Sequence, residues 1–229
     1  MTVDAKSTPA PPSLPVRLLR WLGAPPLPAA FCDALTLDVA VAERATRAEI
    51  IVAIRHCSGN YRDVDYLFGA AVVMLRLLYF VVVPWHVHEY RVLLELPLLF
   101  VISAWLCARL PLRPWLTTPR RRLRQVQTEA AACYVADNVV HTRERTGLLI
   151  YWSVQERRIQ VLPDIGVTAA VPGDRWNAWL FQLRQVPRAA DPRTALRQAI
   201  GALGELLAQH LPAGPDNPDE LPNRPRAAK

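Results

Sequence analysis

The chain has 229 residues, of which 52% are apolar, and its 27 Lys and Arg against 20 Asp and Glu give a formal net charge of +7. That apolar fraction excludes a disordered chain and a coiled-coil rod. The apolar residues are concentrated between residues 66 and 110, whereas both ends are rich in proline and charge. We therefore expect a membrane protein that carries one modest soluble domain.

Arginine supplies nearly all of the positive charge, and its composition with alanine and proline indicates a bacterial origin. A nucleic-acid-binding protein would show a basic face with interleaved aromatic residues in a soluble domain. Here the densest basic cluster directly follows the second apolar run, so we expect the lipid bilayer, and not nucleic acid, as a partner. The cluster consists of Arg120, Arg121, Arg122 and Arg124.

Residues 1–30 form a Pro-rich tail, in which the segment SLPVRLLRWLGAP either lies on the membrane surface or is simply unstructured. We do not expect a cleaved signal peptide. Prolines interrupt the apolar stretch that follows the first arginines, and the bulky Phe31 precedes Cys32 where a small residue would be required.

Two apolar runs, residues 66–83 and 92–110, predict a transmembrane helical hairpin over residues 66–110. At about 1.5 Å per residue each run extends roughly 27–29 Å, which matches the thickness of the hydrocarbon core. A buried hairpin of a soluble protein is the alternative, and two neighbouring runs of this length argue against it.

The flanking arginines predict the orientation, because cytosolic flanks carry the excess of positive charge. Eight arginines flank the two runs outside the connector, and the connector has one. We therefore expect a multi-pass protein of the bacterial inner (cytoplasmic) membrane with both termini in the cytosol. The eight are Arg47, Arg55, Arg62, Arg113, Arg120, Arg121, Arg122 and Arg124, and the one is Arg91.

Besides Arg109 at the end of the second apolar run, two charged residues of opposite sign lie within the runs, Arg76 in the first and Glu95 in the second. In an antiparallel hairpin their depths differ by roughly 6 Å, which an extended arginine side chain can bridge. Such charges sometimes mark an ion or proton path. We favour a pair that neutralises itself, or two side chains that each extend to the membrane surface, since two helices enclose no path.

The remaining residues, 31–65 and 111–211, are numerous enough for one α/β core. Residues 212–229 are expected to be a disordered tail. Helices are predicted at residues 33–46 (with Asp33 as the N-cap), from 119 to about 143 (ended by Gly147), and at 176–186 and 192–211; strands are predicted at 49–56, 148–154 and 158–164, the last two as a hairpin.

The order of these elements, together with the stretches AERATRAEIIVAI, SGNYRDVDYLFGA and RTGLLIYWSVQERRIQVLPDIGV, resembles the TPM-domain family over about residues 35–186. The similarity is strongest to its bacterial membrane branch, in which a transmembrane hairpin is inserted after the first strand. The resemblance implies a compact α/β fold with a sheet flanked by helices. Plant thylakoid members are linked to photosystem II repair and acid phosphatase activity, and an animal member modulates a receptor, whereas the bacterial membrane branch has no settled activity.

We therefore expect a cytosol-facing TPM-like domain that acts as a binding or regulatory module for a membrane complex, with a membrane protein as its partner. If strands 49–56 and 148–154 are parallel neighbours, their carboxyl ends share one edge, where open α/β sheets bind ligands. Because the hairpin is inserted after the first strand, we expect that edge to face the membrane. The candidate ligand or partner site there consists of Arg62, Asp63, Asp65, Glu156 and Arg157.

A metal-dependent phosphatase at the same edge is the alternative function. Asp63, Asp65 and Asp164 are weak candidates for binding a divalent metal. Against this, two carboxylates two residues apart on an extended segment point to opposite faces, and the run after Gln155 is typical of a solvated turn. Ser153 lies within a strand and not on a GxSxG elbow, so no catalytic residue and no cofactor can be assigned. In the connector, His86 and His88 suit only weak metal binding.

Overall fold

The computed structural model describes residues 27–83, 89–110, 113–142, 144–214 and 225–228. These residues form two compact units. One unit contains residues 60–117, and the other contains residues 26–59 together with 118–229. The expected surface segment of the N-terminal tail and the histidines of the connector lie outside the described residues.

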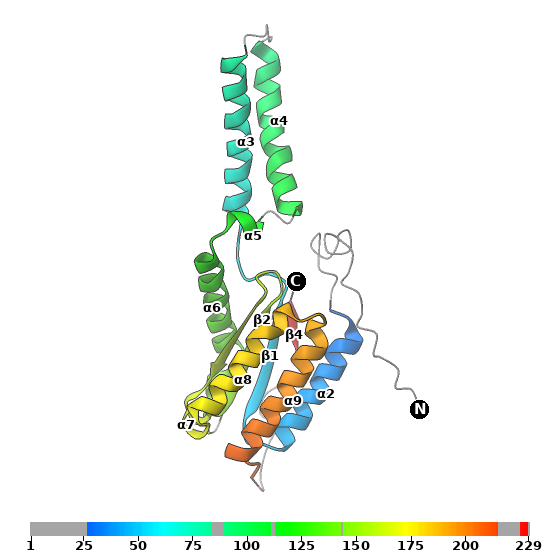
Figure 1. Ribbon diagram of the computed structural model, residues 1–229, viewed down its shortest axis with the longest axis vertical. Coiled ribbons are helices and arrows are strands. Elements are labelled where there is room, and N and C mark those ends of the chain that lie inside the picture. Colours follow the sequence, from blue (N-terminus) through cyan, green and yellow to red (C-terminus); the bar gives the residue numbers. More distant parts are fainter. Residues whose placement is uncertain (1–26, 84–88, 111–112, 143, 215–224, 229) are drawn as a thin grey trace, which may run out of the picture. The chain divides into compact units, whose positions relative to one another are not determined.

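The first unit is helical and contains α3 (Arg62–Val82), α4 (Glu89–Arg109) and the short α5 (Arg113–Leu116). Helices α3 and α4 lie side by side (Figure 1) and are both long and apolar enough to cross a membrane. They run in opposite directions, since Gly69 faces Phe100 whereas the later Arg76 pairs with the earlier Glu95. Helix α3 begins four residues before the apolar run that predicted it, so Arg62 and the two aspartates lie in its first turn.

Small residues let α3 and α4 approach closely. A β-carbon added at Gly69 would lie 3.1 Å from the ring of Phe100. On α4, Ser103, Ala104 and Cys107 are buried, and Cys107 follows the other two by four and three residues, so the three lie on one side of the helix. The large apolar side chains point outward instead, as Leu67 does with 73% of its surface exposed.

The second unit is an α/β body built around a four-stranded sheet in the order β3-β2-β1-β4. Strands β1 (Glu49–Arg55) and β2 (Gly147–Ser153) are parallel, which confirms the predicted pairing. Strand β3 (Arg158–Pro163) returns antiparallel to β2 as the predicted hairpin, and β4 (Arg226–Ala228) lies parallel to the end of β1. The predicted α/β class, with a sheet flanked by helices, is therefore confirmed.

Helices cover both faces of this sheet (Figure 1), and each face has its own apolar core. Alternate residues of β1 and β2 point to opposite faces, so Ile50 packs with α2, α8 and α9 while Ile51 packs with α6. The helices of this unit are α2 (Ala29–Arg44), α6 (Pro119–Ala136), α7 (Ile165–Ala170), α8 (Gly173–Gln185) and α9 (Pro192–His210), with 3-10 turns η1 (Val139–His141) and η2 (Val186–Arg188).

Three sequence predictions were wrong in detail, and one helix was not predicted. Helix α2 begins at Ala29 after Pro28, so Asp33 lies inside it and caps nothing. Helix α6 ends at Ala136, well before residue 143, because Asn138 takes a left-handed conformation with φ 55°. Helix α7 was not predicted, since six residues are too few to show a period. The tail was expected to be disordered from residue 212, yet residues 226–228 form β4.

Candidate functional site

A cluster of polar side chains lies at the carboxyl edge of the sheet, beyond the parallel ends of β1 and β2. We call it the carboxyl-edge cluster; it consists of Cys57, Ser58, Tyr151, Ser153 and Glu156. Main-chain hydrogen bonds carry the pairing past the strands: Val154 donates to the carbonyl of Arg55 at 3.0 Å, and Gln155 donates to that of His56 at 2.9 Å. This extension holds the turn after β2 against the loop after β1.

Glu156 is the centre of the cluster and is only 5% exposed. Its Oε1 accepts from the backbone N–H of Ser58 at 3.1 Å and from the Cys57 thiol at 3.5 Å. Its Oε2 accepts from the hydroxyl of Ser153. One carboxylate therefore connects both strand ends.

The hydroxyl groups of the cluster form a chain of hydrogen bonds with one direction. Because the carboxylate only accepts, Ser153 must donate to Glu156, and Ser58 in turn donates to Ser153 at 2.7 Å. With its only proton used, Ser58 must accept from the hydroxyl of Tyr151 at 2.8 Å. The chain thus runs from Tyr151 through both serines to Glu156. Ser58 is its half-buried member, and the other three are buried.

Burial raises the pKa of Tyr151 to about 12. Its phenol is therefore protonated at every physiological pH and keeps its role as the donor at the start of the chain. Glu156 and Tyr151 are the two ends of this line of polar groups, which begins in the apolar core at Tyr151.

The predicted site residues Glu156 and Arg157 are adjacent in sequence but have different roles. Glu156 was assigned to a solvated turn, and this was wrong, because it faces inward and is hydrogen-bonded. Arg157 is exposed and has a left-handed backbone with φ 51°, as a tight turn requires. A partner can reach Arg157, whereas Glu156 is enclosed.

The other three predicted site residues belong to the helical unit. Arg62 and Asp63 are exposed at the start of α3, whereas Asp65 is 5% exposed. The carboxylate of Asp65 accepts two hydrogen bonds from the Arg113 guanidinium, at 2.7 and 3.0 Å. The segment is helical and not extended as predicted. Asp63 and Asp65 still diverge, since residues two apart do not share a helix face.

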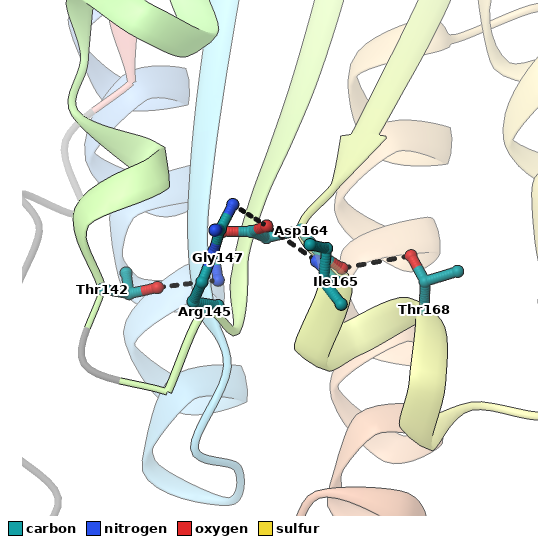
Figure 2. Close-up of polar contacts among 6 residues, drawn as sticks. All are labelled: Thr142, Arg145, Gly147, Asp164, Ile165 and Thr168. Carbon is teal, nitrogen blue, oxygen red and sulfur yellow. Dashed lines mark hydrogen bonds and ion pairs between the residues drawn. The ribbon is translucent and has the colours of Figure 1, made fainter.

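Asp164 lies at the amino edge of the sheet, away from the carboxyl-edge cluster, because β3 runs antiparallel to β2 and ends beside the start of that strand. Figure 2 shows how it is held: Arg145 donates to both of its oxygens, at 3.0 and 3.2 Å, and the backbone N–H of Ile165 donates at 2.7 Å. Asp164 is the N-cap of α7. Burial alone would raise the pKa of Asp164, but the hydrogen bonds and charge of Arg145 and the N–H of Ile165 outweigh it and lower the pKa below its usual value.

Two glycines allow the chain to pack tightly at this corner. A β-carbon at Gly147 would lie 2.4 Å from the carbonyl oxygen of Val139, and one at Gly166 would lie 2.8 Å from that of Arg145. The N–H of Gly147 also bonds to Thr142 at 3.2 Å (Figure 2). The stretches RTG and DIG, which carry much of the family resemblance, therefore meet at one structural corner.

Metal ligation would require three converging His, Cys, Asp or Glu side chains, and the part of the chain that the structure describes contains no such group. Of the weak candidates, Asp65 and Asp164 each have both carboxylate oxygens bonded to an arginine. A cation at either position would have to displace that arginine. The residues described here do not fit a metal at these aspartates.

The opposite charges in the middle of the apolar helices, Arg76 and Glu95, form an ion pair, as the sequence analysis favoured. The guanidinium of Arg76 contacts Glu95 Oε1 through Nε and through Nη2, both at 2.7 Å. Arg76 also lies over the ring of Phe80, with its guanidinium carbon 4.2 Å from the ring centre. The charges of the helix pair are thus neutralised within it, which favours the structural interpretation over a proton path.

Sequence reasoning placed Glu156 at this edge but missed Tyr151 and Ser153 as members of the carboxyl-edge cluster. Tyr151 and Ser153 are two residues apart on β2, so their period of two places both on the same face. The two-residue spacing of Tyr151 and Ser153, with Glu156 three residues beyond Ser153, was the sequence pattern from which the cluster could have been predicted. The hydrogen bonds of Ser58 depend on how the loop after β1 folds back.

Comparisons with known proteins give the fold but no function. No family model and no curated protein matches the chain. Among solved structures, the NMR structure of the BA42 protein from the psychrophilic bacterium Bizionia argentinensis is similar, with a TM-score of 0.55 and 17% sequence identity. The match covers 88% of this chain and 95% of that one. This likeness supports the α/β architecture alone.

Proposed function

We propose that the protein is an integral inner-membrane protein whose α/β unit is a cytosolic binding or regulatory module for a membrane complex. The outward apolar surface of α3 and α4 is the observation that carries this proposal. Only 17% of the residues in the apolar window of each helix are buried, whereas a core hairpin of a soluble protein would be mostly buried. Lipid is the solvent that such a surface requires.

The proposal includes the TPM fold for the α/β unit. Two features support it: the sheet is flanked by helices on both faces, and the stretches that carry the resemblance converge at one corner. Arg145, Gly147, Asp164 and Gly166 are held there by direct contacts. The hairpin α3–α4 follows β1 in the chain, which is where the membrane branch of that family has its insertion.

Membrane orientation is tested by labelling single cysteines in a background that lacks the four native ones. A cysteine at Arg157, which is exposed, should react with a membrane-impermeant thiol reagent only after the cells are permeabilised. A cysteine at His88, in the connector, should react in intact cells. Labelling of residue 157 from outside would place the module in the periplasm and overturn the cytosolic assignment.

The exposed turn at Arg157 is the surface that we assign to the partner. Glu156 shapes this turn from beneath, so the two residues have separable roles. Arg157→Ala should reduce co-purification of a membrane partner while leaving the fold intact. Arg175→Ala, an equally exposed arginine on α8, is the matched control. Identical co-purified proteins for both variants would exclude this turn as the partner site.

A phosphatase remains the second candidate, favoured by one observation. Ser58 is half-buried at the edge where α/β sheets bind ligands, and its proton can pass through Ser153 to a carboxylate. Hydrolysis of a generic phosphoester should then disappear in Ser58→Ala and persist in Arg157→Ala. Chelation tests the metal-dependent form. Phosphate release that is equal in both variants would exclude the cluster as its source.

A further inference from the structure

We infer that the outer edge of β1 is a docking site for an extended segment of a partner protein, and that the chain's own strand β4 covers this edge in the partner's absence. The inference rests on the binding-module proposal for the existence of a partner, and it gives that partner a second contact besides the turn at Arg157. Strand β4 is three residues long, pairs with the last three residues of β1, and lies beside it at one edge of the sheet (Figure 1).

The backbone of β1 offers hydrogen-bonding groups to this edge. In a parallel sheet, successive residues of a strand direct their N–H and C=O groups to opposite neighbours. The N–H of Glu49 donates to the carbonyl of Thr146 at 3.3 Å, so the odd-numbered residues of β1 face β2. Ile50, Val52 and Ile54 therefore face the other edge.

The two ends of this edge are covered in different ways. At the amino end, the N–H of Ile50 donates to the carboxylate of Glu43 at 2.7 Å, so a buried side chain of α2 closes the edge there. At the carboxyl end, the cover is a separate segment of main chain, since Ile54 lies opposite Ala227 of β4. A strand that binds through its main chain can be replaced by another strand, because the ladder uses backbone groups that every sequence has.

The chain that leads to β4 is longer than its path requires. The N–H of Ala213 donates to the carbonyl of Ala45 at 3.2 Å, which anchors the chain before β1. Eight residues separate Ala45 from Ala53, where β4 begins to pair, so these points are at most roughly 26–29 Å apart (53 − 45 = 8). The thirteen residues from Ala213 to Arg226 can span roughly 43–47 Å (226 − 213 = 13). The length of the chain therefore allows β4 to leave the edge and return.

The segment that covers the edge indicates what a partner must carry. Because Ile54 faces β4, the residues on either side of Ala227, which are Arg226 and Ala228, face β1 in return. Ala227 and the buried Pro225 then direct their backbone nitrogens away from β1, where an edge strand tolerates proline. A partner segment that fits is therefore extended, runs parallel to β1, and carries a proline shortly before small residues.

The tether sets the affinity against which a partner competes. A segment joined to its own site by a short tether has an effective concentration on the order of 1 mM. If β4 occupies the edge about nine-tenths of the time, its intrinsic Kd is roughly 0.1 mM. A competing segment then binds the wild-type chain about tenfold more weakly than it binds a chain whose edge is open.

The test is binding of a fluorescent peptide with the sequence of residues 222–229, PNRPRAAK, to the full chain in detergent, followed by anisotropy. Ala228→Pro removes an N–H that faces β1 and should open the edge. Ala227→Pro, the matched control, removes one that faces away. We expect Ala228→Pro to bind the peptide with a Kd of roughly 0.1 mM, about tenfold more tightly than the control and the wild type.

A disulfide gives a second test in which one protein is its own control. The register places Arg55 opposite Ala228, and neighbouring strands lie about 4.8 Å apart, which a disulfide can bridge. The variant Arg55→Cys, Ala228→Cys, in a background that lacks the four native cysteines, should bind no peptide when it is oxidised. Reduction should restore binding.

The contrary outcomes are distinct. Equal binding by the oxidised and the reduced chain would place the peptide elsewhere, and a disulfide-linked dimer would show that β4 is exchanged between two copies. Absence of binding to Ala228→Pro, while the Ile51 amide that faces β2 still exchanges slowly, would show that the edge accepts no separate segment. Each result would overturn the inference. Labelling of residue 157 and co-purification with Arg157→Ala do not involve this edge, so the proposed function can fail separately.

Discussion

Replacing Glu156 by alanine tests whether the carboxyl-edge cluster holds the fold or serves a partner. The substitution removes the acceptor for the Ser58 amide and for the Ser153 hydroxyl. Arg157→Ala, one residue later, removes a longer side chain that is exposed. The left-handed φ of 51° is equally unfavourable for alanine and arginine, so the control leaves the backbone cost unchanged.

The lost hydrogen bonds of Ser58 and Ser153 set the expected size of the effect, because the Cys57 thiol also donates to the carbonyl of Gly59 at 3.1 Å and keeps that acceptor. A buried donor left without a partner costs about 1–3 kcal/mol. Ser153 is fully buried and belongs at the upper end of that range, whereas Ser58 is half-buried, can recover water and belongs at the lower end. We expect Glu156→Ala to lower the free energy of unfolding by about 3 kcal/mol, and Arg157→Ala to change it by less than about 0.5 kcal/mol.

Urea unfolding of the full chain in detergent, followed by far-UV circular dichroism, measures both variants against the wild type. Amide hydrogen exchange adds a local readout, because the Ser58 N–H should exchange faster only in Glu156→Ala. If Glu156→Ala were as stable as Arg157→Ala, the carboxylate would not be the support that its contacts indicate. In that case Glu156 would return to the list of partner-binding residues.

Three further expectations follow from the packing and the charges. Gly201→Ala should stabilise the α/β unit by about 0.5–1 kcal/mol, because the added β-carbon would have no atom within 4 Å. Gly204→Ala should destabilise it by about 1–2 kcal/mol, because the added β-carbon would lie 2.7 Å from the β-carbon of Ala42 on α2. Equal urea midpoints for the two variants would contradict this. Folding lowers the pKa of Asp164 below its unfolded value of 3.8, so this carboxylate stabilises the fold above pH 3.8 and loses that contribution as the pH falls through the folded pKa. Asp164→Asn should therefore make the urea midpoint decline less steeply below about pH 4. A decline as steep as that of the wild type would contradict this role of Asp164. Arg76→Leu or Glu95→Leu alone should reduce the amount of protein found in the membrane fraction, because an unpaired charge in lipid costs about 2.5–3.5 kcal/mol. The double variant, which has neither charge, should reach the wild-type amount. A double variant as impaired as the single ones would favour a proton path.

The sequence by itself determined the elements whose pattern is long or repeated. The two apolar runs predicted α3 and α4, because length and composition suffice to specify such helices. Two short apolar runs joined by the turn at residues 155–157 predicted the β2–β3 hairpin, which the antiparallel pairing confirms. Even the pair of Arg76 with Glu95 could be read, since an antiparallel hairpin fixes which depths meet.

Only the tertiary structure decided how short segments and side chains distant in the sequence come together. Glu156 lies in a polar turn that looks solvated, yet the loop after β1 folds over it and makes it a buried acceptor for Ser58. Asp164 could have been a metal ligand until Arg145 was seen to occupy both of its oxygens. In both cases a residue of the same type is exposed or buried according to which distant part of the chain lies beside it. The local sequence pattern does not specify that neighbour.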